Sequence, residues 1–180
     1  MIEYYQFKHN GGQESYKDGI FLSIVPHMTF LVFYGSNMES GSSEVRKTLS
    51  SIFQGKDMEL GFEELDKKIS ESLPSGSEYM LIRISKDSIQ CSRYGGVEAK
   101  IVMGGEMRQL SNGFFGLSSG DRIVLGTASF FSFLSDEAIL ADALVSGNCS
   151  EWMNYMVRRI SDINELSCGN LTALTLILRD

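Results

Sequence analysis

Runs of predicted strands separated by pairs of predicted helices narrow the possible folds more than any other feature of this chain. Strand-forming segments occur near the beginning, in the middle and at the end of the sequence, and amphipathic segments lie between them. A strict alternation of single strands and single helices would instead predict a parallel sheet. We therefore expect an α+β fold, a four-layer α-β-β-α sandwich of two antiparallel sheets flanked by helices.

The expected strands are rich in β-branched and aromatic residues and are bounded by turn-forming residues. We place them at residues 2–7, 19–25, 28–34, 79–84, 88–94, 98–103, 107–110, 123–125 and 171–178. Glycine pairs at 95–96 and 104–105 separate the middle strands, which predicts a meander. Helices are expected at about residues 43–53, 60–73, 135–145 and 150–163. The final strand, LTALTLIL, is apolar without alternation and should be buried on both faces.

The composition limits the functional classes. The chain has 180 residues, of which 43% are hydrophobic and 22% charged, as in an ordinary globular domain. Its net charge of -7 disfavours a nucleic-acid-binding surface, which needs clustered lysine and arginine. There is no apolar run long enough to span a bilayer and no secretory leader, so we expect a cytoplasmic protein without membrane contact. The 3 cysteines lack Cys-x-x-Cys spacing and are expected to be reduced thiols.

Residues 120–139, GDRIVLGTASFFSFLSDEAI, carry the most specific local pattern. A Gly-Asp turn leads into a short β-branched strand, and a corner of small residues follows at 126–129. After an aromatic turn, Ser135 begins a helix with Asp136 and Glu137 in its first turn. Corners of this kind often carry functional groups, because the strand end is rigid and the turn is open to a ligand. This corner offers no charged side chain.

The same stretch resembles the metal-dependent protein phosphatases of the 2C type, the PPM family with its compact bacterial sporulation-phosphatase relatives. The family's frame is kept as GDRIVL and FLSDEAI, and Asn170 and Thr172 match its closing pattern. The resemblance covers nearly the whole chain and implies the same α-β-β-α sandwich. It also implies one 2C-like domain over residues 1–180, with the family's flap segment shortened to residues 111–119.

The resemblance places several of the family's metal ligands at residues that cannot serve as ligands. Tyr34, Ala128 and Gly169 stand where the family has aspartates, while Gly35 of the second family motif is kept. Asp18 matches a family aspartate only loosely, and an Asp before a glycine is more simply explained by a turn. The degenerate ligand positions are therefore Asp18, Tyr34, Gly35, Ala128 and Gly169.

Magnesium and manganese ions need anionic oxygen ligands, and family members use two such ions to activate the attacking water. Three lost carboxylates predict that the chain is not an enzyme and binds no metal or other cofactor. We also expect no catalytic residue elsewhere. Ser129 lacks the flanking glycines of a nucleophile elbow, and no histidine follows it in the sequence. His9 and His27 have no partner at metal-ligand spacing.

Two classes of function remain open. The leading hypothesis is a catalytically inactive phosphatase-fold protein, a pseudophosphatase that regulates or scaffolds a protein partner. The alternatives are a divergent serine/threonine phosphatase or phosphohydrolase with an atypical metal site, and a module that binds a small ligand in the vacated cleft.

Phe114 and Phe115 are the residues that we expect to bind the partner. They lie between Gly113 and Gly116 in the shortened flap segment. If both rings are exposed, they form an apolar patch at the cleft mouth, and such patches mark interaction sites. The alternative is that both rings pack into the core, where aromatic residues are more often found.

Overall fold

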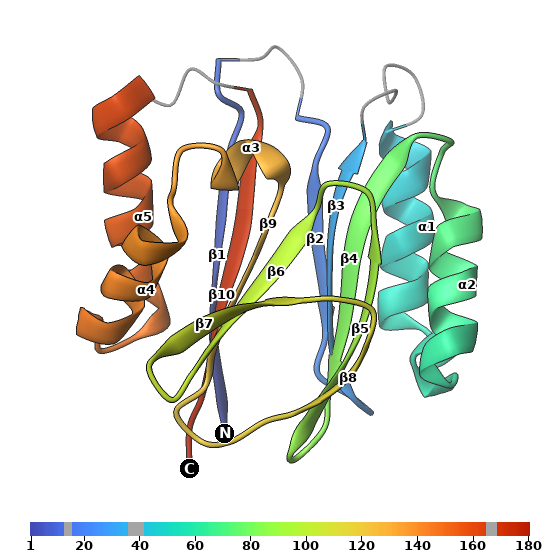
Figure 1. Ribbon diagram of the computed structural model, residues 1–180. Coiled ribbons are helices and arrows are strands. Elements are labelled where there is room, and N and C mark those ends of the chain that lie inside the picture. The colour runs from blue at the N-terminus through green and yellow to red at the C-terminus, as the bar shows by residue number, and fades with distance from the viewer. Residues whose placement is uncertain (13–15, 36–41, 165–168) are drawn as a thin grey trace.

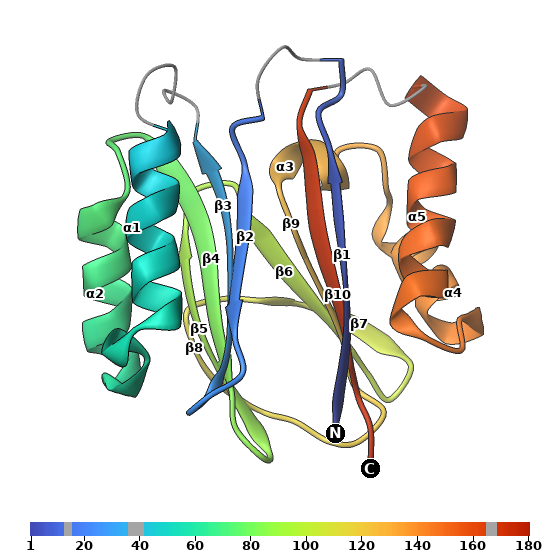
Figure 2. The ribbon, with the colours of Figure 1, turned by 180° about the vertical axis from the view of Figure 1, so that it is seen from behind.

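The computed structural model describes residues 1–12, 16–35, 42–164 and 169–180. Two antiparallel sheets pack face to face, and helices cover the outer face of each sheet (Figures 1 and 2). This is the expected α+β, four-layer α-β-β-α sandwich, so the predicted fold class is confirmed. No helix in the described part of the chain is long and apolar enough to cross a membrane, and the cytoplasmic location stays a prediction.

The first sheet has the strand order β1-β10-β9-β6-β7. Its strands are β1 (Ile2–His9), β10 (Leu171–Leu178), β9 (Arg122–Gly126), β6 (Glu98–Met103) and β7 (Glu106–Leu110). The outer face is covered by α4 (Asp136–Val145) and α5 (Cys149–Asn164), and the short helix α3 (Ala128–Phe131) follows β9 (Figure 1). As predicted, Ser135 caps α4, because its side chain accepts a hydrogen bond from the Ala138 amide at 3.2 Å.

The second sheet has the order β2-β3-β4-β5-β8. Its strands are β2 (Gly19–Ser23), β3 (Met28–Gly35), β4 (Ser77–Ile84), β5 (Ser88–Tyr94) and β8 (Gly113–Gly116). The outer face is covered by α1 (Ser42–Gln54) and α2 (Phe62–Ser72), which a 3-10 helix, η1 (Lys56–Glu59), connects (Figure 2).

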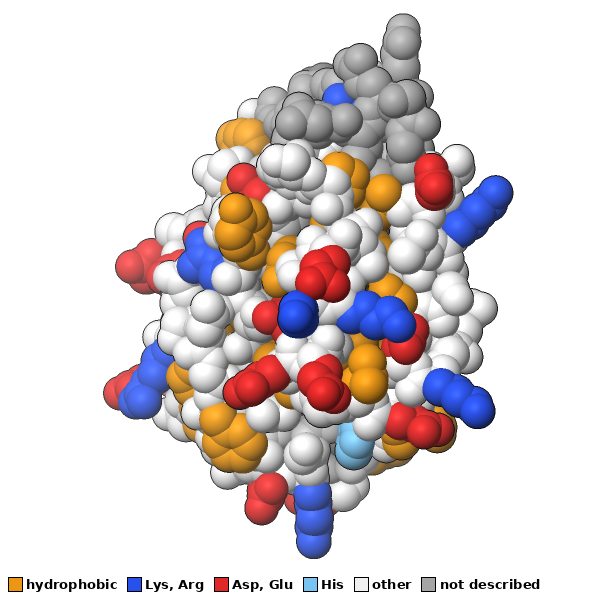
Figure 3. All heavy atoms as spheres, turned by 90° about the vertical axis from the view of Figure 1, so that its right-hand side faces the viewer, with side chains coloured by type: hydrophobic (Ala, Val, Ile, Leu, Met, Phe, Trp, Pro, Cys, Tyr) orange, Lys and Arg blue, Asp and Glu red, His pale blue; other side chains and the backbone are white. Residues whose placement is uncertain are grey.

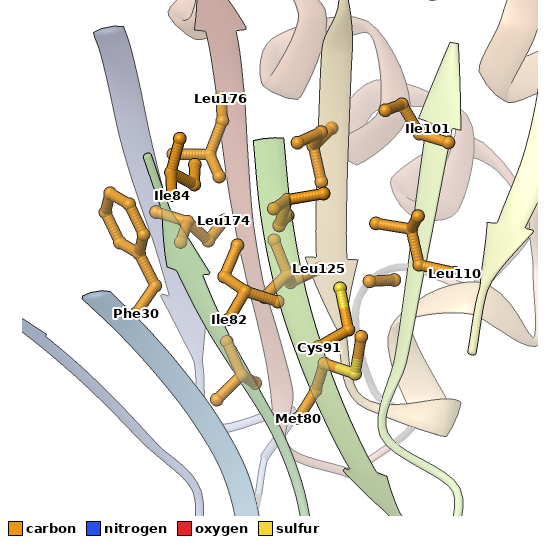
Figure 4. Close-up of a cluster of buried hydrophobic side chains, with 14 of the residues drawn as sticks. Phe30, Met80, Ile82, Ile84, Cys91, Ile101, Leu110, Leu125, Leu174 and Leu176 are labelled. Atoms are coloured by element: carbon orange, nitrogen blue, oxygen red, sulfur yellow. The ribbon is translucent and has the colours of Figure 1, made fainter. Parts of the chain in front are cut away.

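The main core lies between the two sheets, where inward-facing side chains of both sheets interdigitate (Figure 4). Ile82 and Met80 of β4 face Leu125 of β9 and Leu174 and Leu176 of β10 across this layer. Two further clusters fill the space between each sheet and its own helices. All eight residues of β10 are buried, which confirms the double burial expected from its continuous apolar sequence.

The differences from the expected elements are local. The strand predicted at 19–25 ends at Ser23, and several other boundaries move by one or two residues. Strand β8, helix α3 and the 3-10 helix η1 were not predicted. Each is four residues long, and such short segments show no periodicity of their own. Cys91 and Cys149 are free thiols and are buried, and Cys168 lies outside the described residues.

We expect the sheet interface to carry much of the stability. Leu174 is fully buried between the sheets, so Leu174→Ala should lower the free energy of unfolding by about 2–5 kcal/mol. The matched control is Leu144→Ala on α4, where the side chain is 57% exposed and the change should stay within about 0.5 kcal/mol. Urea denaturation followed by circular dichroism measures both. Equal losses in the two variants would contradict this account of the core.

Candidate functional site

Residues of both sheets meet at one end of the sandwich, where β3 and β9 end and β10 begins (Figure 1). We call this region the cleft end and define it by Asp18, Tyr34, Glu78, Ala128 and Thr172. Within the first sheet, the Thr127 amide after β9 donates a hydrogen bond to the Thr172 carbonyl of β10 at 3.0 Å, which extends the pairing of these two strands at this end.

Thr172 is the centre of a buried polar group at the cleft end. Its hydroxyl donates to Asp18 Oδ2 at 2.8 Å and also contacts the Tyr16 hydroxyl. Asp18 is fully buried, yet its Oδ1 has no hydrogen-bond partner in the described part of the chain, and neither has the buried Thr127 Oγ1. Among the described residues, these are the two buried side-chain polar atoms without a partner. Buried polar groups are normally hydrogen-bonded, so their occurrence around one threonine marks a candidate functional site.

Two cations lie beside this group. The guanidinium of Arg46, from α1, lies over the rings of Tyr16 and Phe33 at 5.6 and 5.8 Å, and its Nη2 donates to the carbonyls of Tyr16 and Asp18. Lys8 of β1 is paired in register with Thr172, which places the two side chains on the same face of the sheet. Desolvation and the nearby charge of Arg46 lower the pKa of Lys8. No described carboxylate forms an ion pair with either cation.

The Asp18 carboxyl is a weaker acid than an ordinary aspartate. Burial raises the pKa of its carboxyl to about 6, although the Thr172 hydroxyl, the Arg46 charge and the Asn170 side chain all act in the opposite direction. Burial disfavours the charged form of a carboxyl group, and this effect exceeds the stabilisation by its partners. Asp18 therefore changes its charge close to neutral pH.

Glu78 is a carboxylate at the cleft end that the sequence pattern did not reveal. It faces Tyr34 across the β3–β4 register, and its Oε2 accepts a hydrogen bond from the Gly96 amide at 2.9 Å. A side chain at Gly96 would come within 2.8 Å of Glu78 Oε2 and 3.5 Å of the Ala128 Cβ, so Glu78 approaches one of the degenerate ligand positions. Only the pairing of β3 with β4 could have revealed this neighbour.

The loop that carries Gly169, the last of the degenerate ligand positions, packs tightly against the loop that carries Gly11. Gly169 has a φ of 93°, and Gly11 on the neighbouring loop has a φ of 57°. A Cβ atom at Gly11 would lie 1.8 Å from the Gly169 carbonyl oxygen, so no larger residue fits there. The close approach thus requires glycine at position 11, whereas Gly169 itself is favoured by its positive φ and offers no side chain to a ligand.

Phe114 and Phe115 lie elsewhere and have different environments. Both belong to β8, which pairs with the first half of β5, whereas the cleft end lies near Gly96, beyond the other end of β5. Phe115 packs against the core between the sheets, and Phe114 is 66% exposed beside α2. The expectation that both rings share one environment at the cleft mouth is therefore wrong, because alternate residues of a strand face opposite sides. Their role in binding stays a prediction.

The donor set at the cleft end does not fit a pair of magnesium or manganese ions. Of the five degenerate ligand positions, only Asp18 carries a carboxylate, and one of its oxygens is engaged by Thr172. The parts of the chain that the structure describes contain no group of three or more His, Cys, Asp or Glu residues placed to hold a metal ion. A binuclear site needs several anionic oxygen ligands.

No known protein-family model matches the sequence, and no curated protein matches it. Solved structures do match. The photosystem II phosphatase PBCP has a TM-score of 0.81 at 13% identity, over 99% of both chains. The serine/threonine phosphatase PstP/Ppp of Mycobacterium tuberculosis has a TM-score of 0.77 at 14% identity, also over 99% of both. PppA, described as a key regulatory component of T6SS in Pseudomonas aeruginosa, has a TM-score of 0.76 at 13% identity, over 98% of this chain and 97% of that one.

These matches establish that the chain has the fold of PPM-type serine/threonine phosphatases, and they correct the expectation that it is not an enzyme. The structures that align with it from end to end include active phosphatases, among them the catalytic domain of PstP in complex with 2 manganese ions. The fold is thus that of a class of enzymes. The altered ligand positions, inferred from sequence, do not carry the conclusion that this chain lacks activity.

The raised pKa of Asp18 predicts how stability depends on pH. Its pKa rises from 3.8 to about 6 on folding, so the native state binds this proton more tightly than the unfolded state. The resulting stabilisation is complete below about pH 4 and is lost as the pH rises through about 6, up to roughly 3 kcal/mol. Asp18→Asn should flatten this part of the profile and be more stable than the wild type near pH 7.5.

Denaturant unfolding at a series of pH values tests this prediction. Asp87→Asn is the control, since Asp87 is exposed in the β4–β5 turn and should leave the profile unchanged. If the profile of Asp18→Asn followed that of the wild type, the assignment of the titrating group would be wrong.

Proposed function

We propose that this chain is a regulatory protein of phosphatase fold that binds a phosphorylated segment of a protein partner at the cleft end. The observation that carries the proposal is the pair of neighbouring cations, Lys8 and Arg46. Neither forms an ion pair with a described carboxylate, although the charge of Arg46 acts on the buried Asp18 carboxyl. Two neighbouring positive charges repel each other unless an anion joins them. A phosphoryl group supplies close to two negative charges and three acceptor oxygens.

Arg46 is suited to hold such a group. Its Nη2 is anchored on two backbone carbonyls, and its plane is supported by two aromatic rings, so little side-chain freedom is lost on binding. Lys8 contributes a point charge from the opposite sheet. Charged hydrogen bonds of this kind are roughly twice as strong as neutral ones.

Other observations support a regulatory role and a cytoplasmic location. PppA, which has the same fold, is described as a regulatory component. The match over 99% of this chain and 99% of PBCP supports the interpretation of residues 1–180 as one 2C-like domain with a shortened flap segment. The two described cysteines are free thiols, as is usual for proteins of reducing compartments.

A divergent phosphohydrolase is the second candidate, and Asp18 favours it. A carboxyl group with a pKa of about 6 can accept and return a proton near neutral pH. Perturbed acids of this kind gather at active sites. In this alternative, Lys8 and Arg46 would hold the phosphoryl group while a water molecule attacks phosphorus and the ester P–O bond breaks. Asp18 would take up the water proton through the polar group around Thr172 and return it to the leaving oxygen, which departs as the alcohol.

Removal of one cation tests phosphoryl binding. Lys8→Gln should weaken the binding of a phosphoserine peptide by about tenfold or more, the loss expected for one charged hydrogen bond. Lys86→Gln is the matched control, because Lys86 is an exposed lysine in the β4–β5 turn at the opposite end of the sandwich. Calorimetric titration with the phosphorylated and unphosphorylated peptide measures both. Equal affinities for the two peptides, or an unchanged affinity in Lys8→Gln, would contradict the proposal.

An aryl-phosphate assay, run with and without Mn²⁺, separates the two candidates. Hydrolysis by the wild type that disappears in Asp18→Asn would favour the phosphohydrolase. Phosphopeptide binding without hydrolysis would favour the regulatory protein.

A further inference from the structure

A groove of about 610 Å³ lies on the outer face of the second sheet, away from the cleft end. It is bounded by α2 on one side and by β5 and β8 on the other, and its lining includes Phe62, Glu63, Asp66, Gln90, Asn112 and Phe114. Helices α1 and α2 pack over β2, β3 and β4. The outer face of β8 is left uncovered beside α2, and this is where the groove forms.

Strand β8 forms an open edge along this groove. It is the last strand in the order β2-β3-β4-β5-β8, so one side of its backbone pairs with β5 and the other side has no strand partner among the described residues. Proteins usually protect such edges with charged residues. Strand β7, at the edge of the other sheet, follows that rule and carries the exposed pair Glu106 and Arg108. Strand β8 has the sequence GFFG and carries no charge.

The groove offers an apolar anchor beside the open edge. Phe114 is 66% exposed and lines the groove together with the partly buried Phe62. A Cβ atom added at Gly113 or at Gly116 would meet no described atom within 4 Å, so both ends of β8 are open to an approaching chain. An exposed aromatic ring next to unpaired backbone is a suitable contact for an added strand.

The charge of the groove identifies the kind of segment that fits. Asp66 is engaged by the Tyr79 hydroxyl at 3.0 Å and by Ser92 Oγ at 2.8 Å. Lys67 lies 4.0 Å from Glu71. Glu63 is exposed and has no ion-pair partner among the described residues. Figure 3 shows acidic and basic side chains interspersed on the face of α1 and α2, with hydrophobic side chains visible between and around them. The groove lining contains Glu63 and Asp66 against the single cation Lys67, so its net charge is negative and favours a basic partner.

We propose that the groove between α2 and β8 binds an extended, basic segment of a partner protein, which adds as a strand to the open edge of β8. The backbone of the segment pairs with β8, an apolar side chain covers Phe114, and a lysine or arginine reaches Glu63. This contact goes beyond the phosphoryl site and does not depend on it, because the groove lies on a different face and its ligand needs no phosphate.

A synthetic strand-forming peptide of lysine and valine residues, unphosphorylated, tests the proposal. Added to isotope-labelled protein at about 0.15 M salt, it should shift the amide signals of residues 113–116 and slow the hydrogen exchange of the β8 amides that face away from β5. A peptide with glutamate in place of each lysine should bind at least tenfold more weakly. Phe114→Ser should weaken binding of the lysine peptide at least tenfold without lowering the melting temperature.

Matched variants make the outcome decisive. Leu144→Ser removes another exposed apolar side chain, on α4, and should leave peptide binding unchanged. Glu63→Lys should reverse the preference between the lysine and glutamate peptides. Equal binding of both peptides by the wild type, or unchanged signals in β8, would overturn the proposal. Concentration-dependent protection of β8 without peptide would also overturn it, because the occupant would then be a second copy of this chain.

Discussion

The double burial of β10 is the constraint on which the rest of the architecture depends. This strand lies between β1 and β9 and is covered by the second sheet on one face and by helices on the other. Leu174 and Leu176 fill the space between the sheets, and Leu171 and Ala173 pack toward the helices. A strand so placed tolerates polar side chains only where they find partners, because an unpaired buried polar group costs about 1–3 kcal/mol.

The two buried threonines of β10 illustrate this rule. Thr175 donates to the Cys149 carbonyl at 3.0 Å, and Thr172 donates to Asp18 at 2.8 Å. Thr172 lies next to the first residue of β10, and its hydroxyl contacts the side chains of Tyr16 and Asp18 from the loop before β2. The Asp18 oxygen that Thr172 does not reach is left without a partner among the described residues. The site therefore sits where the packing of β10 ends and the polar loops begin.

The sequence predicted those parts of the molecule that depend on local patterns. The apolar run 171–178 predicted a fully buried strand, and Ser135 with its following acids predicted the start of α4. By contrast, β8 forms because β5 offers it a pairing edge, and GFFG alone has no strand pattern. Lys8, Arg46 and Glu78 reach the cleft end from three separate elements, so only the tertiary fold reveals them as neighbours of Asp18 or Ala128. The alignment of ligand positions showed which carboxylates were missing, but it could not show which charges the fold supplies instead.

The two proposed contacts, the phosphoryl site and the groove beside β8, would together allow two weak binding sites to select one partner. A phosphoryl group held by Lys8 and Arg46 would be partly solvated, because Lys8 is exposed, and a short strand beside β8 would form few hydrogen bonds. Each contact alone predicts weak binding.

When one partner carries both a phosphorylated segment and a basic extended segment, the second contact becomes intramolecular once the first has formed. Its effective concentration then reaches the millimolar range for a short linker, and overall affinity can rise by about 10²–10⁴ without any new contact. A partner with only one segment gains nothing, and a linker too short to reach from the cleft end to β8 forbids the joint contact. Selectivity would then rest on the spacing of the two segments in the partner.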